Sequence, residues 1–394
     1  MMLLQGHTRQ SIKVTLLTLV ILMVSTAWGR VEISGDLAIT GTALDKHAPV
    51  NTNFRGDDPF DLTRLRLFVR TQATENIGVY TEILLDNEAD VRMNGAYVYV
   101  QDIIANHLDL KAGMIPSPFG NYGLRSTYFN LNPLIGVPAL WHYKTGLTPN
   151  MYVTNEDLIN PEGEVLNHHS GVVLGYDACW DIGVEALFFW PGLEVSGAIT
   201  AGSMGNPRAR FNDGYQVMGK FSILPVMGVR LGASFARGPF MTPSADAGGY
   251  LLSGTAPAAP TADSQENQTT VGIHGEWLTG HWQWFLEAAQ VDFDTPYVFE
   301  KKLTVQTAYV EGRWDFLPGY YLAGRYDVWR YSKIAPYATG SGGNYEWGYD
   351  FNRMESALGW RVNRQTLMKL DFQYWDYLAE PDLRLAALQM HLAF

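Results

Sequence analysis

Hydrophobic and polar residues alternate at a period of two over most of this chain. The alternation is clear in five segments, at residues 64–70, 108–112, 229–235, 358–363 and 369–375. Because successive side chains of a strand point to opposite faces, the pattern predicts strands with one apolar and one polar face. A soluble sheet would show the same pattern locally. The alternation persists over most of the chain, and this favours a closed transmembrane barrel, because a barrel needs no second layer of structure packed against its sheet.

The connections between the predicted strands differ in length along the chain. Short ones, such as residues 75–76 and 278–281, alternate with long ones, such as 117–168 and 238–268. Short turns on one side and longer loops on the other are typical of bacterial outer-membrane barrels, and this spacing predicts about sixteen antiparallel strands. The fold class is therefore all-β. Residues 169–203 are expected to hold two strands, with three short ones as the alternative.

The N-terminal segment, residues 1–27, has the pattern of a secretory signal peptide. Arg9 and Lys13 precede the apolar stretch 14–24, and small residues follow, with cleavage expected after Ala27 or as late as Gly29. A single membrane anchor is the alternative, but the apolar run is too short for one. The remaining residues, 28–394, are predicted to form one barrel domain.

The C-terminal strand ends on an aromatic residue. Phe394, Leu392 and Met390 fall on one face at period two. This resembles the last strand of Gram-negative outer-membrane barrels, which the assembly machinery reads. The two termini together predict export through a signal peptide and insertion into outer-membrane lipid.

Composition narrows the classes of function. The 394 residues include 13% aromatic and 17% charged side chains, with a net charge of −12. A mean hydropathy of −0.08 excludes a polytopic helical membrane protein. The acidic balance argues against nucleic acid as a partner. The one cysteine, Cys179, excludes an intramolecular disulfide framework and Cys-rich metal sites, and no cofactor is expected.

A family resemblance begins at the end of the predicted fifth strand. Residues 111–120 read Lys-x-Gly-x-x-x-x-Pro-Phe-Gly and open a long aromatic loop. This run resembles the porin O and P family of phosphate-selective porins. The resemblance implies a sixteen-stranded outer-membrane porin, commonly a homotrimer. The arginine and lysine ladder of that family cannot be matched residue by residue, so phosphate selectivity does not carry over.

The loop at residues 117–168 is the third long one, which in porins folds inward and narrows the pore. Its aromatic content and its prolines favour packing inside the barrel, with an external cap as the alternative. Arg125 and Lys144 are its only Lys or Arg residues, and we expect them at the constriction. The acidic candidates beside them are Glu156, Asp157, Glu162 and Glu164.

Charged side chains on the polar face are expected to line the pore, because Arg or Lys at the lipid midplane costs about 2–4 kcal/mol. The basic candidates are Arg64, Arg66, Arg70, Lys111, Arg125, Lys144, Arg313, Arg325, Arg361 and Lys369. Arg64, Arg66 and Arg70 share one face of one strand. They form either an anion track or a wall of charges neutralised by Glu82 on the next strand.

The pattern as a whole predicts a passive channel for small hydrophilic solutes or ions, with anion preference as the finer hypothesis. The alternative is a sleeve for a multihaem cytochrome partner, which would have to supply the haems because no Cys-x-x-Cys-His motif is present. An enzyme is not expected. His168, His169 and Ser170 are adjacent, and neighbouring residues of an extended chain point to opposite sides, so they do not build a charge relay.

Overall fold

A computed structural model describes eleven stretches of the chain. They are residues 30–44, 63–85, 91–126, 131–147, 171–175, 180–206, 214–241, 266–295, 301–333, 347–377 and 382–394. The predicted signal peptide lies outside the described residues. So do the acidic candidates Glu156, Asp157, Glu162 and Glu164.

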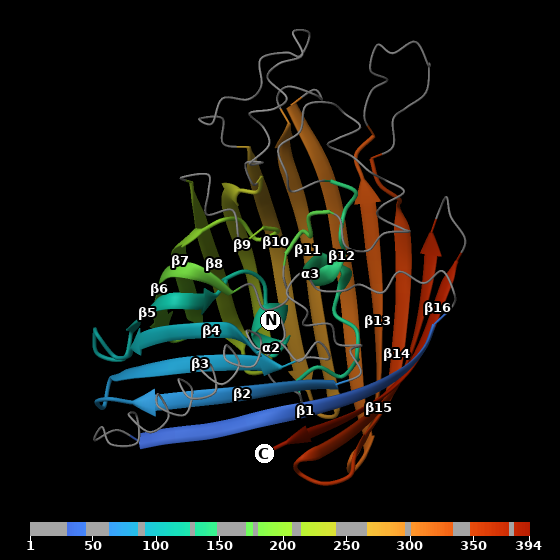
Figure 1. The fold of residues 1–394 in the computed structure, drawn as a ribbon, viewed down its shortest axis with the longest axis horizontal. Coiled ribbons are helices and arrows are strands. Elements are labelled where there is room, and N and C mark those ends of the chain that lie inside the picture. Colours follow the sequence, from blue (N-terminus) through green and yellow to red (C-terminus); the bar gives the residue numbers. More distant parts are fainter. Residues whose placement is uncertain are drawn as a thin grey trace, which may run out of the picture.

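Sixteen strands form one closed barrel in which each strand pairs antiparallel with its neighbours in sequence (Figure 1). The strands are β1 (Arg30–Leu44), β2 (Thr63–Gln72), β3 (Ile77–Leu85), β4 (Val91–Val100), β5 (Leu108–Pro116), β6 (Trp180–Trp190), β7 (Leu193–Ala201), β8 (Tyr215–Val226), β9 (Val229–Pro239), β10 (Asn267–Thr279), β11 (Trp282–Thr295), β12 (Lys301–Leu317), β13 (Tyr320–Tyr331), β14 (Phe351–Arg361), β15 (Thr366–Tyr377) and β16 (Leu383–Ala393). The predicted fold class is confirmed.

Two strands, β6 and β7, occupy the segment for which three short ones were the alternative. They form a hairpin whose pairing runs from Trp190 opposite Leu193 to Gly183 opposite Thr200. Gly192 in the turn has a φ of 78°, a conformation that glycine adopts without strain. The tight turn ends the first strand at Trp190.

The period-two pattern sorts side chains between lipid and lumen. In β14, Met354 is 57% exposed and Leu358 is exposed on the same outer face. Arg353 and Glu355 alternate with them and are each 2% exposed, inside the barrel. A charge on the outer face would be costly, whereas the inner face offers polar partners. This difference determines which alternate residues of each strand face the lipid and which face the lumen.

Aromatic side chains gather on the outer face beside the short turns. Trp282 and Trp314 stack with ring centroids 5.4 Å apart, and Tyr320 and Trp360 stack at 6.0 Å. Tryptophan and tyrosine are enriched where a membrane meets water, because each ring has an apolar body and a polar atom. This band therefore has the composition of one membrane interface.

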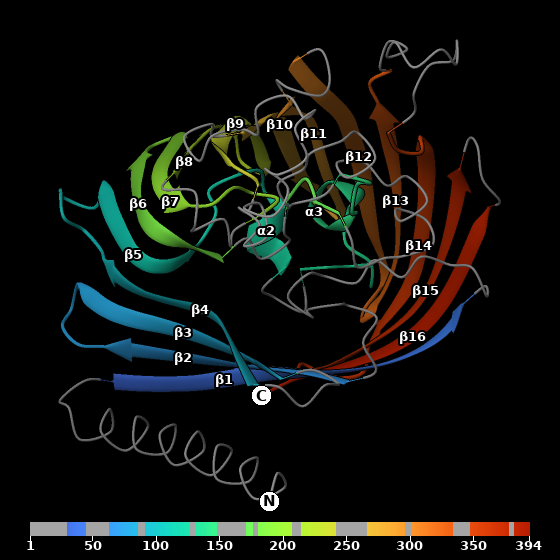
Figure 2. The ribbon, with the colours of Figure 1, turned by 45° about the horizontal axis from the view of Figure 1, so that its top comes forward.

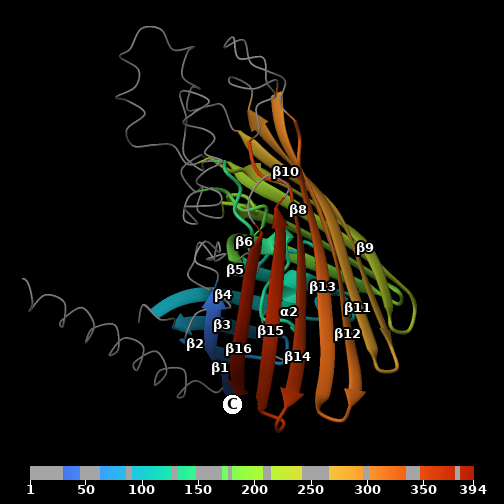
Figure 3. The ribbon, with the colours of Figure 1, turned by 90° about the vertical axis from the view of Figure 1, so that its right-hand side faces the viewer.

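The barrel closes between its first and last strands, where Asp36 pairs with Ala393 and Leu44 with Leu385. The amides of Gly35 and Phe394 each donate to the carbonyl of the other residue, at 2.9 and 3.0 Å. A Cβ on Gly35 would lie 2.7 Å from the Phe394 ring, so glycine makes room for the terminal aromatic side chain. Figure 3 shows the C-terminus at the end where short turns join β12 to β13 and β14 to β15.

The third loop enters the barrel after β5. Its two short helices, α2 (Tyr122–Ser126) and α3 (Ala139–His142), lie within the ring of strands (Figure 2). The inward loop is therefore confirmed over its described residues, 117–126 and 131–147. None of the helices in the described stretches is long and apolar enough to span a membrane.

Candidate functional site

The inward loop begins with a turn against the wall of β8 and β9. Gly120 has a φ of 57°, which allows the chain to reverse after Pro118. Its amide donates to Ser234 Oγ on β9 at 3.0 Å. The ammonium of Lys220 on β8 donates to Gly120 O at 2.6 Å and to Asn121 Oδ1 at 3.0 Å. Strand side chains therefore fix the backbone of the loop at its entry.

Glu287 on β11 holds both helical parts of the loop. Its Oε1 accepts from the amides of Asn121 and of Tyr122, the latter at 2.9 Å. Its Oε2 accepts from the indole Nε1 of Trp141 in α3 at 2.6 Å. Glu287 is 2% exposed, so these three donors replace the water that its carboxylate has lost.

Arg125 in α2 carries a charge from the loop to the wall. Its Nη1 donates to Glu311 Oε1 on β12 at 2.7 Å, and its guanidinium lies 3.7 Å from the ring centroid of Phe285. Burial, the largest single effect, lowers the pKa of the Arg125 guanidinium, but the charge and hydrogen bond of Glu311 together with Tyr309 and Tyr122 outweigh it, so the pKa lies above its ordinary value. Arg125 therefore stays charged, with its ion-pair partner on a strand.

Arg325 on β13 lies at the centre of the buried charges. It donates to Glu311 at 3.1 Å, to Asp327 at 3.2 Å and to Glu355. It also donates to the carbonyl of Gly136 in the loop at 3.0 Å. One cation thus links carboxylates on three strands to the loop backbone, which is the arrangement that compensates the desolvation of buried charges.

The loop segment before α3 binds the wall through its own amides. Ile135 N donates to Asp371 Oδ2 at 2.9 Å, Gly136 N to Glu355 Oε1 at 2.7 Å and Ala139 N to Asp327 Oδ1 at 2.9 Å. We call the set Glu287, Glu311, Asp327, Glu355 and Asp371 the carboxylate row. It has one member on each strand from β11 to β15, and every member bonds to the loop.

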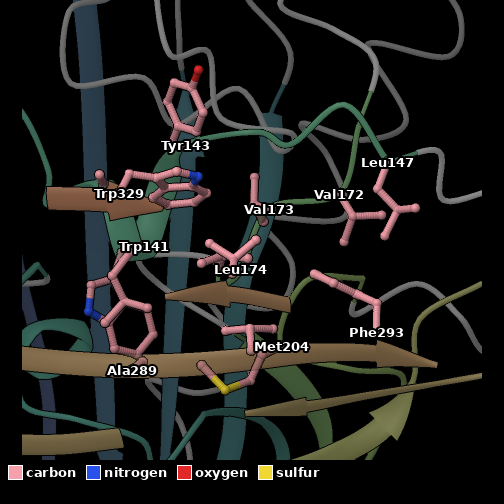
Figure 4. Packing of buried hydrophobic residues seen from close by; sticks show 14 of the residues in the cluster. Trp141, Tyr143, Leu147, Val172, Val173, Leu174, Met204, Ala289, Phe293 and Trp329 are labelled. Carbon is pink, nitrogen blue, oxygen red and sulfur yellow. The ribbon is translucent and has the colours of Figure 1, made fainter. Parts of the chain in front are cut away.

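Apolar packing inside the barrel continues from the carboxylate row toward the strand ends that carry the longer loops. Figure 4 shows Trp141 and Tyr143 of the loop among wall residues that include Trp329 and Phe293. The Tyr143 ring centroid lies 4.9 Å from that of Trp329 and 4.5 Å from that of Phe351. The loop therefore has two attachments, one polar and one aromatic.

The part of the wall formed by β16, β1 and β2 pairs its charges differently. Arg66 on β2 donates through Nε and Nη2 to the two oxygens of Asp36 on β1, at 3.1 and 2.8 Å. His391 Nε2 on β16 lies 3.2 Å from the same carboxylate. Glu82, the neutralising group expected from the sequence, accepts from Asn94 Nδ2 at 3.0 Å. Arg66 therefore has an ion-pair partner on the neighbouring strand β1.

The remaining basic candidates lie on strands around the inner face, except for Lys144, which belongs to the loop. Lys111 pairs with Glu185 at 2.9 Å and Arg313 with Asp315 at 2.7 Å. Lys369 donates to the carbonyl of Leu134 in the loop at 3.1 Å. The other positions are these: Arg64 and Lys144 are buried, Arg70 is exposed, and Arg361 is half-buried. That these side chains line a conducting pore stays a prediction.

Sequence reasoning missed Arg353, which binds Asp327 at 3.0 Å and the carbonyl of Val137 at 2.6 Å. Arg353 is an even number of residues from Glu355 and from Arg361 on the same strand, and this spacing could have placed it on the inner face. The period-two pattern of the sequence puts Glu287, Glu311, Asp327, Glu355 and Asp371 on the inner face, but it does not show that these carboxylates bind the loop. Within the described ranges, no group of three or more His, Cys, Asp or Glu side chains is placed to hold a metal ion.

Comparison with known proteins supports the fold alone. No family model matches the sequence, and no curated protein matches it. The loop L8 deletion mutant of OmpT, an outer membrane protein of Vibrio cholerae, superposes with a TM-score of 0.54 at 10% identity, over 93% of this chain and 99% of that chain. The anion-selective porin of Comamonas acidovorans gives 0.52 at 9%, over 93% and 100%. OmpF of Salmonella typhi in complex with daunomycin gives 0.50 at 11%, over 92% and 97%.

The barrel and its inward loop define the class of fold. It is a closed sixteen-stranded antiparallel β-barrel of the kind found in outer-membrane porins. In this chain the carboxylate row binds the loop on one half of the wall, and arginine and tyrosine side chains line the other half.

Proposed function

We propose that this chain is an outer-membrane porin, a passive diffusion channel for small hydrophilic solutes or ions. The observation that carries the proposal is the inward loop, bound by its own backbone to one half of a wall whose lumen face is polar. Such a loop narrows the barrel. Diffusion through the narrowed barrel needs neither an energy source nor a cofactor. The exposed apolar outer face and the band of aromatic residues support insertion into lipid.

The finer proposal is a preference for anions. The carboxylate row is occupied by loop amides, by Arg125 and by Arg325. Among the half-buried acids at other positions, Glu194 is paired with Arg230 at 3.0 Å and Asp315 with Arg313 at 2.7 Å. Arg70 is exposed, and within the described ranges it has no ion pair. Rings and clusters of one charge sign attract the opposite ion, so Arg70 favours anions.

The test is a planar bilayer containing the purified barrel under a gradient of potassium chloride. Open channels are the expected result, and a reversal potential displaced toward the chloride equilibrium value would establish anion preference. A folded barrel without conductance would overturn the channel. Haem absorbance in the purified material would then support the cytochrome sleeve.

Assembly and family are part of the same proposal. The run at residues 111–120 supports a relationship to the porin O and P family, and with it a homotrimer in outer-membrane lipid. Export requires the signal peptide expected at residues 1–27. We propose no catalytic activity. Cross-linking in native membranes followed by mass measurement tests the trimer.

A further inference from the structure

Aromatic side chains line the lumen on the half of the wall that lies opposite the carboxylate row. We call them the aromatic platform: Phe68 on β2, Tyr80 on β3, Tyr97 and Tyr99 on β4, and Trp180 at the start of β6. Tyr80 and Trp180 stack at 6.0 Å with an interplanar angle of 12°, and Tyr97 and Trp180 at 6.1 Å and 24°. Phe68 continues the stack from Tyr80 at 6.4 Å.

Two glycines allow these rings to lie against the wall. A Cβ on Gly95 would be 2.8 Å from the Trp180 ring, and a Cβ on Gly78 would collide with Tyr99. The hydroxyl of Tyr99 donates to Gln72 Oε1 at 3.1 Å, which fixes this ring over β3. The close approach at the two glycines and the hydrogen bond of Tyr99 therefore position the platform against the wall.

A hollow opens beside the platform, lined by Arg70, Tyr80, Tyr97, Tyr99, Asp109 and Lys111 among others. Two of its three charges have partners. Lys111 pairs with Glu185 at 2.9 Å, and Asp109 Oδ1 accepts from the amide of Asp102 at 3.0 Å. Arg70 is exposed and has no ion pair within the described ranges. It is the cation that the hollow offers to a solute.

We propose that this hollow is a binding subsite for small anions that carry a planar ring, of which aromatic carboxylates are the simplest. This rests on the proposed channel function and names the solute class that the channel favours. The ring of the solute stacks on Tyr97 and Tyr99, and its carboxylate binds the guanidinium of Arg70, whose planar donors fit two carboxylate oxygens. Binding of moderate strength speeds entry and still allows exit.

The experiment measures how benzoate inhibits the chloride current of the purified full-length barrel in a planar bilayer. Acetate, which has the charge without the ring, and benzyl alcohol, which has the ring without the charge, are the comparison solutes. We expect half-inhibition by benzoate at a concentration about tenfold lower than by acetate, and no inhibition by benzyl alcohol. Equal inhibition by benzoate and acetate would overturn the subsite.

Three variants locate the effect. Arg70→Gln should abolish inhibition by benzoate, and Tyr99→Thr should make benzoate no better than acetate. Arg361→Gln is the matched control, because Arg361 also faces inward without an ion pair in the described ranges but lies on β14, away from the platform. If Arg361→Gln weakened inhibition as much as Arg70→Gln, general electrostatics would explain the effect and the subsite would be wrong.

Failure of the subsite is distinguishable from failure of the channel. Channels that conduct chloride but do not discriminate benzoate from acetate would overturn the subsite alone. A barrel that forms no channel in salt would overturn the proposed function. Calorimetric titration of benzoate into the detergent-solubilised barrel then decides on the subsite, with binding lost in Arg70→Gln as the supporting result and no binding to the parent barrel as the contrary one. Circular dichroism verifies that each variant folds.

Discussion

The two halves of the inner wall solve one physical problem in different ways. On β11 to β15, the carboxylate row is buried and binds amides or arginines that include those of the inward loop. On β2 to β6, inward tyrosines and basic residues border a hollow, and Arg70 is exposed. The lipid excludes charge from the outer face of both halves. What differs is the partner, which is the protein's own loop in one half and, in our proposal, the solute in the other.

The largest effect is expected at the centre of the carboxylate row. Arg325→Met removes the cation shared by Glu311, Asp327 and Glu355; Glu311 keeps Arg125 and Asp327 keeps Arg353, but the buried Glu355 loses its cation. Breaking a buried ion pair in this way costs about 3–5 kcal/mol. We expect a lower urea midpoint of unfolding in detergent micelles, followed by circular dichroism.

Arg313→Met is the matched control for that variant. Arg313 is also an inward arginine with a carboxylate partner, Asp315, but their side chains are only partly buried. A partly exposed pair contributes about 0–1 kcal/mol. Equal loss of stability in the two variants would contradict the view that the row is a buried anchor.

The next effect is expected in the behaviour of the loop. Glu287→Leu leaves the amides of Asn121 and Tyr122 and the indole of Trp141 without their acceptor. Each unsatisfied buried donor costs about 1–3 kcal/mol. If the loop leaves the wall, these donors can hydrogen-bond to water instead. A detached loop narrows the barrel less and moves more, so we expect a larger single-channel conductance and more open-channel noise. Bilayer recordings measure both.

Glu287→Gln keeps one acceptor oxygen, so its conductance and its open-channel noise should lie between those of the parent and those of Glu287→Leu. Glu194→Gln serves as the control, because Glu194 is half-buried and its ion-pair partner is Arg230 on β9 and not a group of the loop. If the Glu194 variant were as noisy as Glu287→Leu, loss of a lumen charge would be the cause and the anchor would play no part.

The period-two pattern determines how much of the fold and of the candidate site could be predicted from the sequence. Period two fixes which face each side chain takes, so the strands, the barrel and the inward charges could be predicted. Periodicity does not encode which inward groups meet across the lumen. The partner of Arg125 was expected among loop acids outside the described residues, and the structure gives Glu311. One partner of Arg66 is Asp36, which lies directly opposite it in the antiparallel pairing of β1 with β2.

The third effect concerns ion preference and the other half of the wall. Changing Arg64, Arg66 and Arg70 together to Glu should shift the reversal potential toward cations. An unchanged potential would end the anion-track hypothesis. Because Asp36 already neutralises Arg66, Arg70→Glu alone should produce most of the shift, and Arg66→Gln little of it. A larger shift in the Arg66 variant would mean that the pair with Asp36 opens in the conducting barrel.

The smallest effect comes from one substitution made in both halves. Tyr321→Phe removes the hydroxyl that donates to the loop carbonyl of Pro133 at 2.9 Å, and Tyr99→Phe removes the one that donates to Gln72 at 3.1 Å. Each bond contributes about 0.5–1.5 kcal/mol. We expect Tyr321→Phe to add open-channel noise and Tyr99→Phe to add none, because only the first bond reaches the loop. Equal noise in both recordings would mean that the aromatic packing of Trp141 and Tyr143 holds the loop, with the polar contacts fixing only its register.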